Sequence, residues 1–227
     1  MLTLEDNFIK LQNRIEKACN LASISANNVQ LVAVSKRHSV DKMKALYALG
    51  QRHFAENYLQ EALVKQTALE DLGICWHFIG HIQRNKTRTL AEQFDWVHSV
   101  DRTQIATRLS EQRPNHLPAL NICLQVNIDY EQSKSGFTPE QVPEVFEQIV
   151  ELPGLSLRGL MAIPSASADS QQQADAMRRM QQLFQRLRGP ANFDTLSMGM
   201  SRDLEIAVQA GATMLRVGEA LFGPRPN

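Results

Sequence analysis

The chain has 227 residues, of which 43% are hydrophobic and 21% are charged, an ordinary composition for a soluble globular protein. Its 24 basic and 24 acidic residues cancel to a formal net charge of zero, so nucleic acid is not an expected partner. The cysteines Cys19, Cys75 and Cys123 are widely spaced and form no CxxC pair, which argues against a disulfide framework or a zinc site. Neither a signal peptide nor an apolar run of roughly 18 residues is seen, so we expect a cytoplasmic protein without a membrane partner.

The first predicted element is an amphipathic helix over residues 4–22, where apolar residues recur at helical spacing. Short apolar or alternating runs follow it and predict strands. These strands cover residues 31–35, 53–57, 76–80, 96–100, 120–127, 155–163, 195–198 and 214–218. Helical periodicity covers residues 40–49, 58–69, 102–111, 139–152, 174–187 and 204–210, whereas connection 83–93 is the most polar. Residues 165–174 are typical of a polar loop that leads into a helix.

This alternation of strand and helix predicts an α/β fold with a parallel sheet, because parallel neighbours need a crossover that usually contains a helix. Eight such units indicate closure into a (β/α)8 TIM barrel with an extra N-terminal helix. An open doubly wound sheet is the alternative, but it usually has a glycine-rich turn after its first strand. Here that turn is Ser35-Lys36-Arg37-His38. We therefore expect a single barrel domain over residues 1–227.

Lys36 is the first candidate functional residue, because functional sites of such barrels are built at the carboxyl ends of the strands. It directly follows the apolar run Leu31-Val32-Ala33-Val34 and Ser35. Burial beside the barrel axis would favour the neutral amine that imine formation with an aldehyde requires. Position alone is equally consistent with a strand-end lysine whose ammonium reaches water.

The ends of the last two strands predict a phosphate site, as in many barrels of this class. Ser201 precedes the helical pattern 204–210, whose N-terminal N–H groups would attract an anion. Gly218 follows the last strand and allows close approach of the backbone. Simple helix capping by Ser201 and a tight turn at Gly218 are the alternative interpretation.

Several motifs in a fixed order extend this interpretation over nearly the whole chain. They are VAVSK at 32–36, FAENY at 54–58, WHFIGHIQRNK at 76–86, SKSGF at 133–137, RGLM at 158–161, MGMSRD at 198–203 and RVGEALFG at 216–223. On these motifs the chain resembles the pyridoxal phosphate homeostasis family, which is related to the N-terminal barrel of alanine racemase. The resemblance implies a barrel of that type that binds pyridoxal 5'-phosphate (PLP), the active form of vitamin B6.

The resemblance also implies roles for individual residues. Lys36 would hold PLP as a covalent imine (a Schiff base, the internal aldimine), and Arg216 would face the pyridine nitrogen. The hydroxyl of Ser201 and the backbone N–H groups of Gly218 and Glu219 would hold the phosphate.

Three further residues are candidates for the pocket or its mouth. Asn57 follows the second strand and is expected to line the cofactor pocket. His77 is a candidate for the same pocket, but alternation with Phe78 leaves its direction open, and a core histidine is the favoured interpretation. Lys134 lies on the loop after the fifth strand, near the mouth, where a solvated loop lysine is the alternative.

Arg216 bears on whether the chain catalyses a reaction. A guanidinium does not give up its proton, so a pyridine nitrogen beside it stays unprotonated and the ring is a weak electron sink. We therefore expect a non-catalytic carrier or buffer of PLP that affects amino-acid and keto-acid metabolism indirectly, with no catalytic residues.

The expected partners of such a carrier are PLP, PLP-dependent apoenzymes and PLP-producing enzymes, and a monomer is expected. One alternative is a low-activity PLP-dependent racemase, with Tyr130 as the least improbable second base. Another alternative is a Schiff-base aldolase or a barrel that binds a sugar phosphate.

Overall fold

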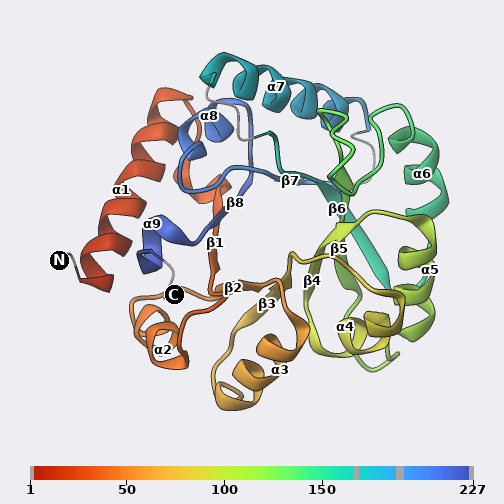
Figure 1. Cartoon of the computed structure of the whole chain (residues 1–227), viewed down its shortest axis with the longest axis horizontal. Coiled ribbons are helices and arrows are strands. Elements are labelled where there is room, and N and C mark those ends of the chain that lie inside the picture. Colours follow the sequence, from red (N-terminus) through yellow and green to blue (C-terminus); the bar gives the residue numbers. More distant parts are fainter. Residues whose placement is uncertain (1–2, 166–168, 188–191, 225–227) are drawn as a thin grey trace.

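Eight parallel strands close into a barrel in the order β1 to β8, with β8 pairing back onto β1, and the helices surround this ring (Figure 1). The computed structural model describes residues 3–165, 169–187 and 192–224. The strands are β1 (Gln30–Val34), β2 (His53–Glu56), β3 (Cys75–Phe78), β4 (Trp96–Val100), β5 (Leu120–Val126), β6 (Leu155–Ala162), β7 (Thr195–Ser197) and β8 (Met214–Val217). The predicted (β/α)8 barrel is therefore confirmed.

Helices connect successive strands, as predicted. They are α1 (Leu4–Leu21), α2 (Val40–Ala48), α3 (Leu59–Ala68), α4 (Thr87–Gln93), α5 (Thr103–Gln112), α6 (Val142–Ile149), α7 (Ser170–Arg186), α8 (Leu204–Gln209) and α9 (Glu219–Phe222), with short 3-10 turns at Ala26–Asn28 and Arg84–Lys86. The extra N-terminal helix is confirmed as α1, which begins at a capping box formed by Thr3 and Asp6. In the described part of the chain, no helix is long and apolar enough to cross a membrane.

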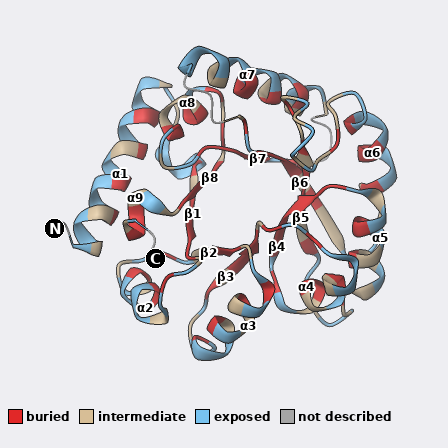
Figure 2. Ribbon diagram, viewed as in Figure 1, coloured by how far each residue is buried: buried red, intermediate tan, exposed pale blue. Residues whose placement is uncertain are grey.

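Most apolar side chains pack between the strand ring and the surrounding helices, which is why buried residues line the inner sides of the helices in Figure 2. A second, smaller set lies inside the ring. It contains Val32, Val34, Ala55, Trp96, Cys123, Met161 and Met214. Because side chains alternate across a strand, the neighbours of these residues point outward. These interior residues fill the barrel below its carboxyl ends, so that a pocket at those ends is closed from beneath.

Three differences from the predicted elements have local causes. α7 begins at Ser170, because Asp169 caps it by accepting from the N–H of Gln171. The predicted polar loop is therefore shorter than 165–174, and its residues 166–168 lie outside the described residues. The polar connection 83–93 contains α4, whose buried face carries Thr87, Leu90 and Ala91. α9 was not predicted, because four residues are too few for a periodic signal.

Candidate functional site

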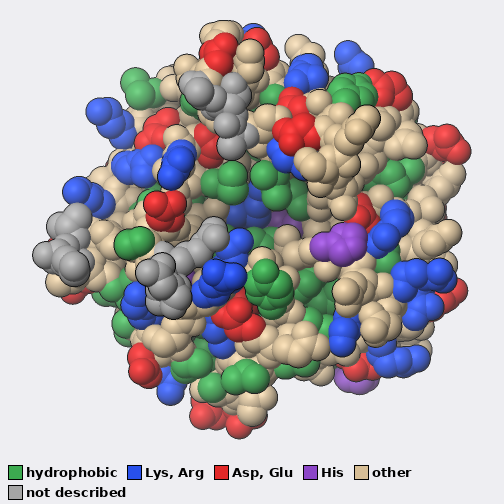
Figure 3. Space-filling view, in the orientation of Figure 1, with side chains coloured by type: hydrophobic (Ala, Val, Ile, Leu, Met, Phe, Trp, Pro, Cys, Tyr) green, Lys and Arg blue, Asp and Glu red, His purple; other side chains and the backbone are tan. Residues whose placement is uncertain are grey.

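A cavity of about 460 Å³ lies at the carboxyl ends of the strands, within the size range of small-molecule and cofactor sites. In Figure 3, Lys or Arg, His and hydrophobic side chains gather around a hollow near the middle of the face that is shown. The cavity lining includes every residue predicted to bind the cofactor. These are Lys36, Asn57, Ser201, Arg216, Gly218 and Glu219. Residues about 180 positions apart in the chain meet here because β8 pairs with β1.

Lys36 is half-buried and lies in a tight turn directly after β1. The turn is closed by the N–H of His38, which donates to the carbonyl of Ser35 at 3.0 Å. Arg37 has a φ of +62°, a left-handed conformation that costs a non-glycine residue about 1–3 kcal/mol. Its N–H donates to Oε1 of Glu61 at 2.5 Å. The turn that presents Lys36 is therefore held by contacts from outside the barrel.

The main support of this turn is a buried lysine, Lys65 of α3, which the sequence analysis did not identify. Its ammonium donates to the Ser35 carbonyl and to Oε1 of both Glu56 and Glu61, each at 2.7 Å. Glu56 is fully buried and also accepts from the Ser35 hydroxyl at 2.7 Å. Burial raises the pKa of Glu56, and Lys65 opposes that rise. The Glu56 side chain therefore points away from the cavity, toward Lys65 of α3.

Asn57 lies one residue further on and does line the cavity. Its side-chain oxygen is buried and accepts no hydrogen bond from any described residue, so it keeps polar capacity for a ligand. Gly80, on the neighbouring strand end, packs directly against it. A Cβ at Gly80 would lie 2.1 Å from the Asn57 carbonyl oxygen, so only glycine allows this approach of the two backbones.

Ser201 lies at the cavity, but in a different local setting from the predicted one. The N-cap of α8 is Asp203, so Ser201 does not cap that helix. Its hydroxyl accepts from the N–H of Ala220 at 3.1 Å, in the first turn of α9. Its carbonyl accepts from Arg14 of α1 at 3.1 Å, and Arg14 also pairs with Glu205 at 2.8 Å. The N-terminal helix thus helps to hold the loop that carries Ser201.

Gly218 and Glu219 lead from β8 into α9, and Gly218 is the N-cap. Among the described residues, no acceptor binds the backbone N–H of either, as is usual for the first N–H groups of a helix. A Cβ at Gly218 would lie 3.2 Å from the Val34 carbonyl oxygen. The loop can therefore lie close to the end of β1, where its two N–H groups and the Ser201 hydroxyl border the same cavity.

Arg216 is 4% exposed and lies on β8 beneath this loop. Its guanidinium donates to Ser197 Oγ at 2.7 Å and to the Ala162 carbonyl at 3.0 Å. Burial lowers its pKa to about 10, so it stays charged at neutral pH. No carboxylate among the described residues bonds to it, and its remaining N–H groups are available to an acceptor in the cavity.

Three candidates of the sequence analysis lie outside the lining of this cavity. His77 is fully buried in the barrel and bonds to His53 and His98, so it is a core histidine and does not line the cavity. Tyr130 is 51% exposed, and its hydroxyl donates to Glu140. Lys134 lies at an adjoining pocket, where it bonds to Glu131 and to the Ile163 carbonyl.

Comparison with known proteins identifies the family of the chain. Residues 9–226 match the family described as alanine racemase, N-terminal domain. The chain is 52% identical over 225 residues to the pyridoxal phosphate homeostasis protein of Pseudomonas aeruginosa, covering 99% of this chain and 97% of the relative. It is 42% identical over 229 residues to the protein of that name from Escherichia coli K12, covering 99% and 98%.

Solved structures show the same relationship. PipY of Synechococcus elongatus, in a structure with PLP bound, is 36% identical with a TM-score of 0.79, covering 92% of this chain and 100% of PipY. An alanine racemase of Clostridium difficile shares only the fold, at 15% identity and a TM-score of 0.72, and this chain covers 57% of it. The chain belongs to the pyridoxal phosphate homeostasis protein family, within the wider alanine racemase N-terminal domain family.

Proposed function

We propose that this chain binds pyridoxal 5'-phosphate in the cavity and serves intracellular PLP homeostasis as a carrier, without catalysing a reaction of its own. The observation that carries this proposal is that one cavity collects a strand-end lysine, two backbone N–H groups that no described residue accepts from, and a buried arginine. An amine, an anion site and a hydrogen-bond donor are the groups that an aldehyde, a phosphate and a pyridine nitrogen require. The PLP-bound structure of PipY supports the same ligand.

In this proposal Lys36 supplies the covalent link. Its amine would hold the cofactor as an imine with the aldehyde carbon, with loss of water. The Ser201 hydroxyl and the N–H groups of Gly218 and Glu219 would donate to the phosphate. Asn57 would contribute its amide, and Arg216 would donate to the pyridine nitrogen.

The carrier role follows from Arg216 and from the cavity lining. PLP supplies an electron sink when its ring nitrogen is protonated, but a guanidinium can only donate to that nitrogen. A racemase would also need a second base, and Tyr130 is directed to Glu140 outside the cavity. No tyrosine occurs among the described residues that line the cavity.

Absorbance and mass spectrometry test the lysine directly. With PLP, the protein should absorb visible light, and borohydride reduction should fix the cofactor on the peptide that contains Lys36. The variant Lys36→Ala should lose both signals. Lys134→Ala is the matched control, because Lys134 lies at the neighbouring pocket, and it should keep both. Retention of the signals in Lys36→Ala would refute the assignment.

Two further assays separate a carrier from an enzyme. The loaded protein should restore the activity of a PLP-dependent apoenzyme when the two are mixed. Amino acids incubated with the loaded protein in deuterated water should keep their α-proton. Exchange of that proton would favour the racemase alternative, and borohydride trapping of a substrate carbonyl without PLP would favour an aldolase.

A further inference from the structure

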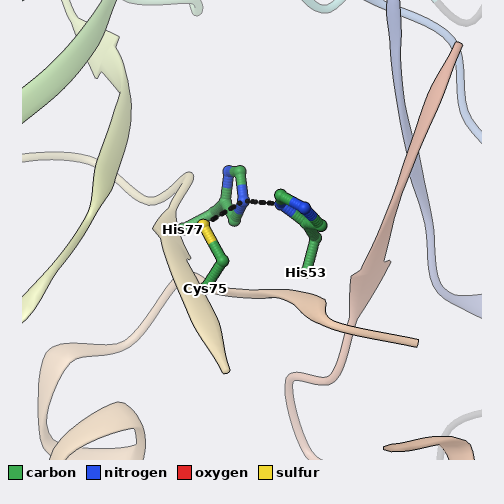
Figure 4. A group of neighbouring side chains, drawn as sticks. All are labelled: His53, Cys75 and His77. Atoms are coloured by element: carbon green, nitrogen blue, oxygen red, sulfur yellow. Dashed lines mark hydrogen bonds between the residues drawn. The ribbon is translucent and has the colours of Figure 1, made fainter. Parts of the chain in front are cut away.

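A line of hydrogen bonds runs through the barrel interior from the amino ends of the strands to Arg216. We call it the interior line, and it consists of His53, His77, His98, Ser197 and Arg216. His53 Nδ1 lies 2.9 Å from His77 Nε2, His77 Nδ1 lies 2.9 Å from His98 Nε2, and His98 Nδ1 lies 2.9 Å from Ser197 Oγ. Arg216 donates to the same Ser197 oxygen at 2.7 Å. Figure 4 shows the outer end of the interior line, where His53 and Cys75 both face His77.

Burial favours the neutral form of all three histidines. Burial lowers the pKa of His98 to about 3, and it lowers the pKa of His77 well below its usual range. Burial also lowers the pKa of His53. A neutral imidazole has one N–H donor and one acceptor nitrogen, so each ring can pass a hydrogen bond from one neighbour to the next.

Arg216 sets the direction of the interior line, because a guanidinium can only donate. Ser197 accepts from it, and its hydroxyl proton then points to His98 Nδ1. His98 donates through Nε2 to His77, which donates through Nε2 to His53. In the opposite direction the Ser197 hydroxyl, which is fully buried, would accept from both Arg216 and His98, and no described residue is recorded as an acceptor for its proton. Leaving such a group without a partner costs about 1–3 kcal/mol, so the direction away from Arg216 is favoured.

We propose that His77, His98 and Ser197 are positioning residues for Arg216, and that they act as a one-way line of hydrogen bonds. None of the three lines the cavity, so they act through the guanidinium. Donation of the Ser197 proton to His98 makes its oxygen a better acceptor for Arg216. This inference rests on the proposed function in one respect, the contact between Arg216 and PLP. The hydrogen bonds of the interior line do not depend on it.

A metal site is the competing explanation for the outer end of the interior line. One ligand atom each from His53, Cys75 and His77 lie within 4.8 Å of one another. Burial raises the pKa of the metal-free Cys75 thiol to about 12, so metal binding would have to displace the thiol proton. It would also need an unprotonated His77 Nε2, which in the interior line carries the proton. The two explanations therefore require opposite tautomers of His77.

Long-range ¹H–¹⁵N NMR of the protein without PLP tests the direction. All three histidines of the interior line should carry their proton on Nε2, and His77 and His98 should not titrate between pH 5 and 8. A proton on Nδ1 of any of the three would overturn the proposal. Addition of zinc is a second test: a shift of the His77 proton to Nδ1 in its presence would also overturn the proposal.

Variants test the effect on the cofactor. His98→Phe should weaken PLP binding about tenfold and shift the pH at which the bound cofactor's absorbance changes. His98→Gln keeps a donor and an acceptor and should restore both. If His98→Phe does not fold, Ser197→Ala, which removes one oxygen, should show the same losses. Wild-type binding and an unshifted pH profile in a folded His98→Phe or Ser197→Ala would overturn the positioning role. Failure of the wild type to bind PLP would refute the proposed function, while the tautomer measurement would still decide the interior line.

Discussion

Substitution of Lys65 by methionine should destabilise the fold, because it removes the ion-pair partner of the buried Glu56 carboxylate. The Lys65 side chain is 6% exposed and that of Glu56 is 0% exposed, with 2.7 Å between Nζ and Oε1. Lys65→Met keeps most of the volume but leaves the Glu56 carboxylate with only the Ser35 hydroxyl as a described partner. Breaking a buried ion pair from one side costs about 3–5 kcal/mol. In a chain of this length, that loss lowers Tm by roughly 6–20 °C.

The stability lost in Lys65→Met should depend on pH in a definite direction. The pKa of Glu56 is already raised by burial, so ionisation of Glu56 disfavours the folded state at high pH. Without Lys65, which lowers it, the pKa of Glu56 should rise further. The loss of stability should therefore be largest near pH 8 and should shrink as pH falls toward the usual carboxyl range, because the folded variant takes up a proton.

Denaturant unfolding at pH 8 and pH 5.5 measures this dependence. Adding Glu56→Gln should return part of the stability, because the uncompensated charge is gone. A loss below about 1 kcal/mol, or the same loss at both pH values with no recovery in the double variant, would refute the reasoning.

The remaining predictions concern a glycine and the thiols. Gly80→Ala should weaken PLP binding and cost about 1–3 kcal/mol, because its Cβ would lie 2.1 Å from the Asn57 carbonyl oxygen. Gly73→Ala, with its nearest contact at 3.6 Å, should bind PLP like the wild type, and equal binding by both variants in a titration would contradict this. Burial raises the pKa of Cys123 to about 12, so at pH 8 a disulfide reagent should label Cys123 only after denaturation. Rapid labelling of the native protein would show that this thiol is accessible.

The fold could be predicted from the sequence because each strand is a short apolar run followed by polar residues. The predicted starts of β2, β4, β5, β6, β7 and β8 agree with the structure. Strand ends were predicted one residue too long where the chain leaves the sheet but stays buried, as at Ser35 and Met198. Periodicity reports burial, and both residues stay buried and still donate a backbone hydrogen bond to the neighbouring strand, Ser35 to Ala55 and Met198 to Met214.

The site was predictable where a residue follows a strand end, as Lys36 and Asn57 do. The contacts that support it were not, because they join different elements, such as Lys65 of α3 and Ser35, 30 residues earlier in the chain. Nothing near Lys65 in the sequence indicates that its ammonium lies under the turn of Lys36. His98 and Ser197 are 99 residues apart, and only closure of the ring brings their side chains together. Alternation shows which residues share a face, but not which strands meet across the barrel.

Pairing of β8 with β1 has a consequence for the timing of cofactor loading. The ribosome makes the turn with Lys36 roughly 180 residues before Arg216, an interval of roughly 10–40 s at usual elongation rates. Until β8 joins β1, Lys36 and the loop of Gly218 are not in the same place. If the proposed function holds, PLP that reacts with the nascent chain would meet Lys36 without the loop proposed to hold the phosphate. Stable loading should therefore follow chain completion, and a stalled chain that ends before β8 should release the cofactor quickly.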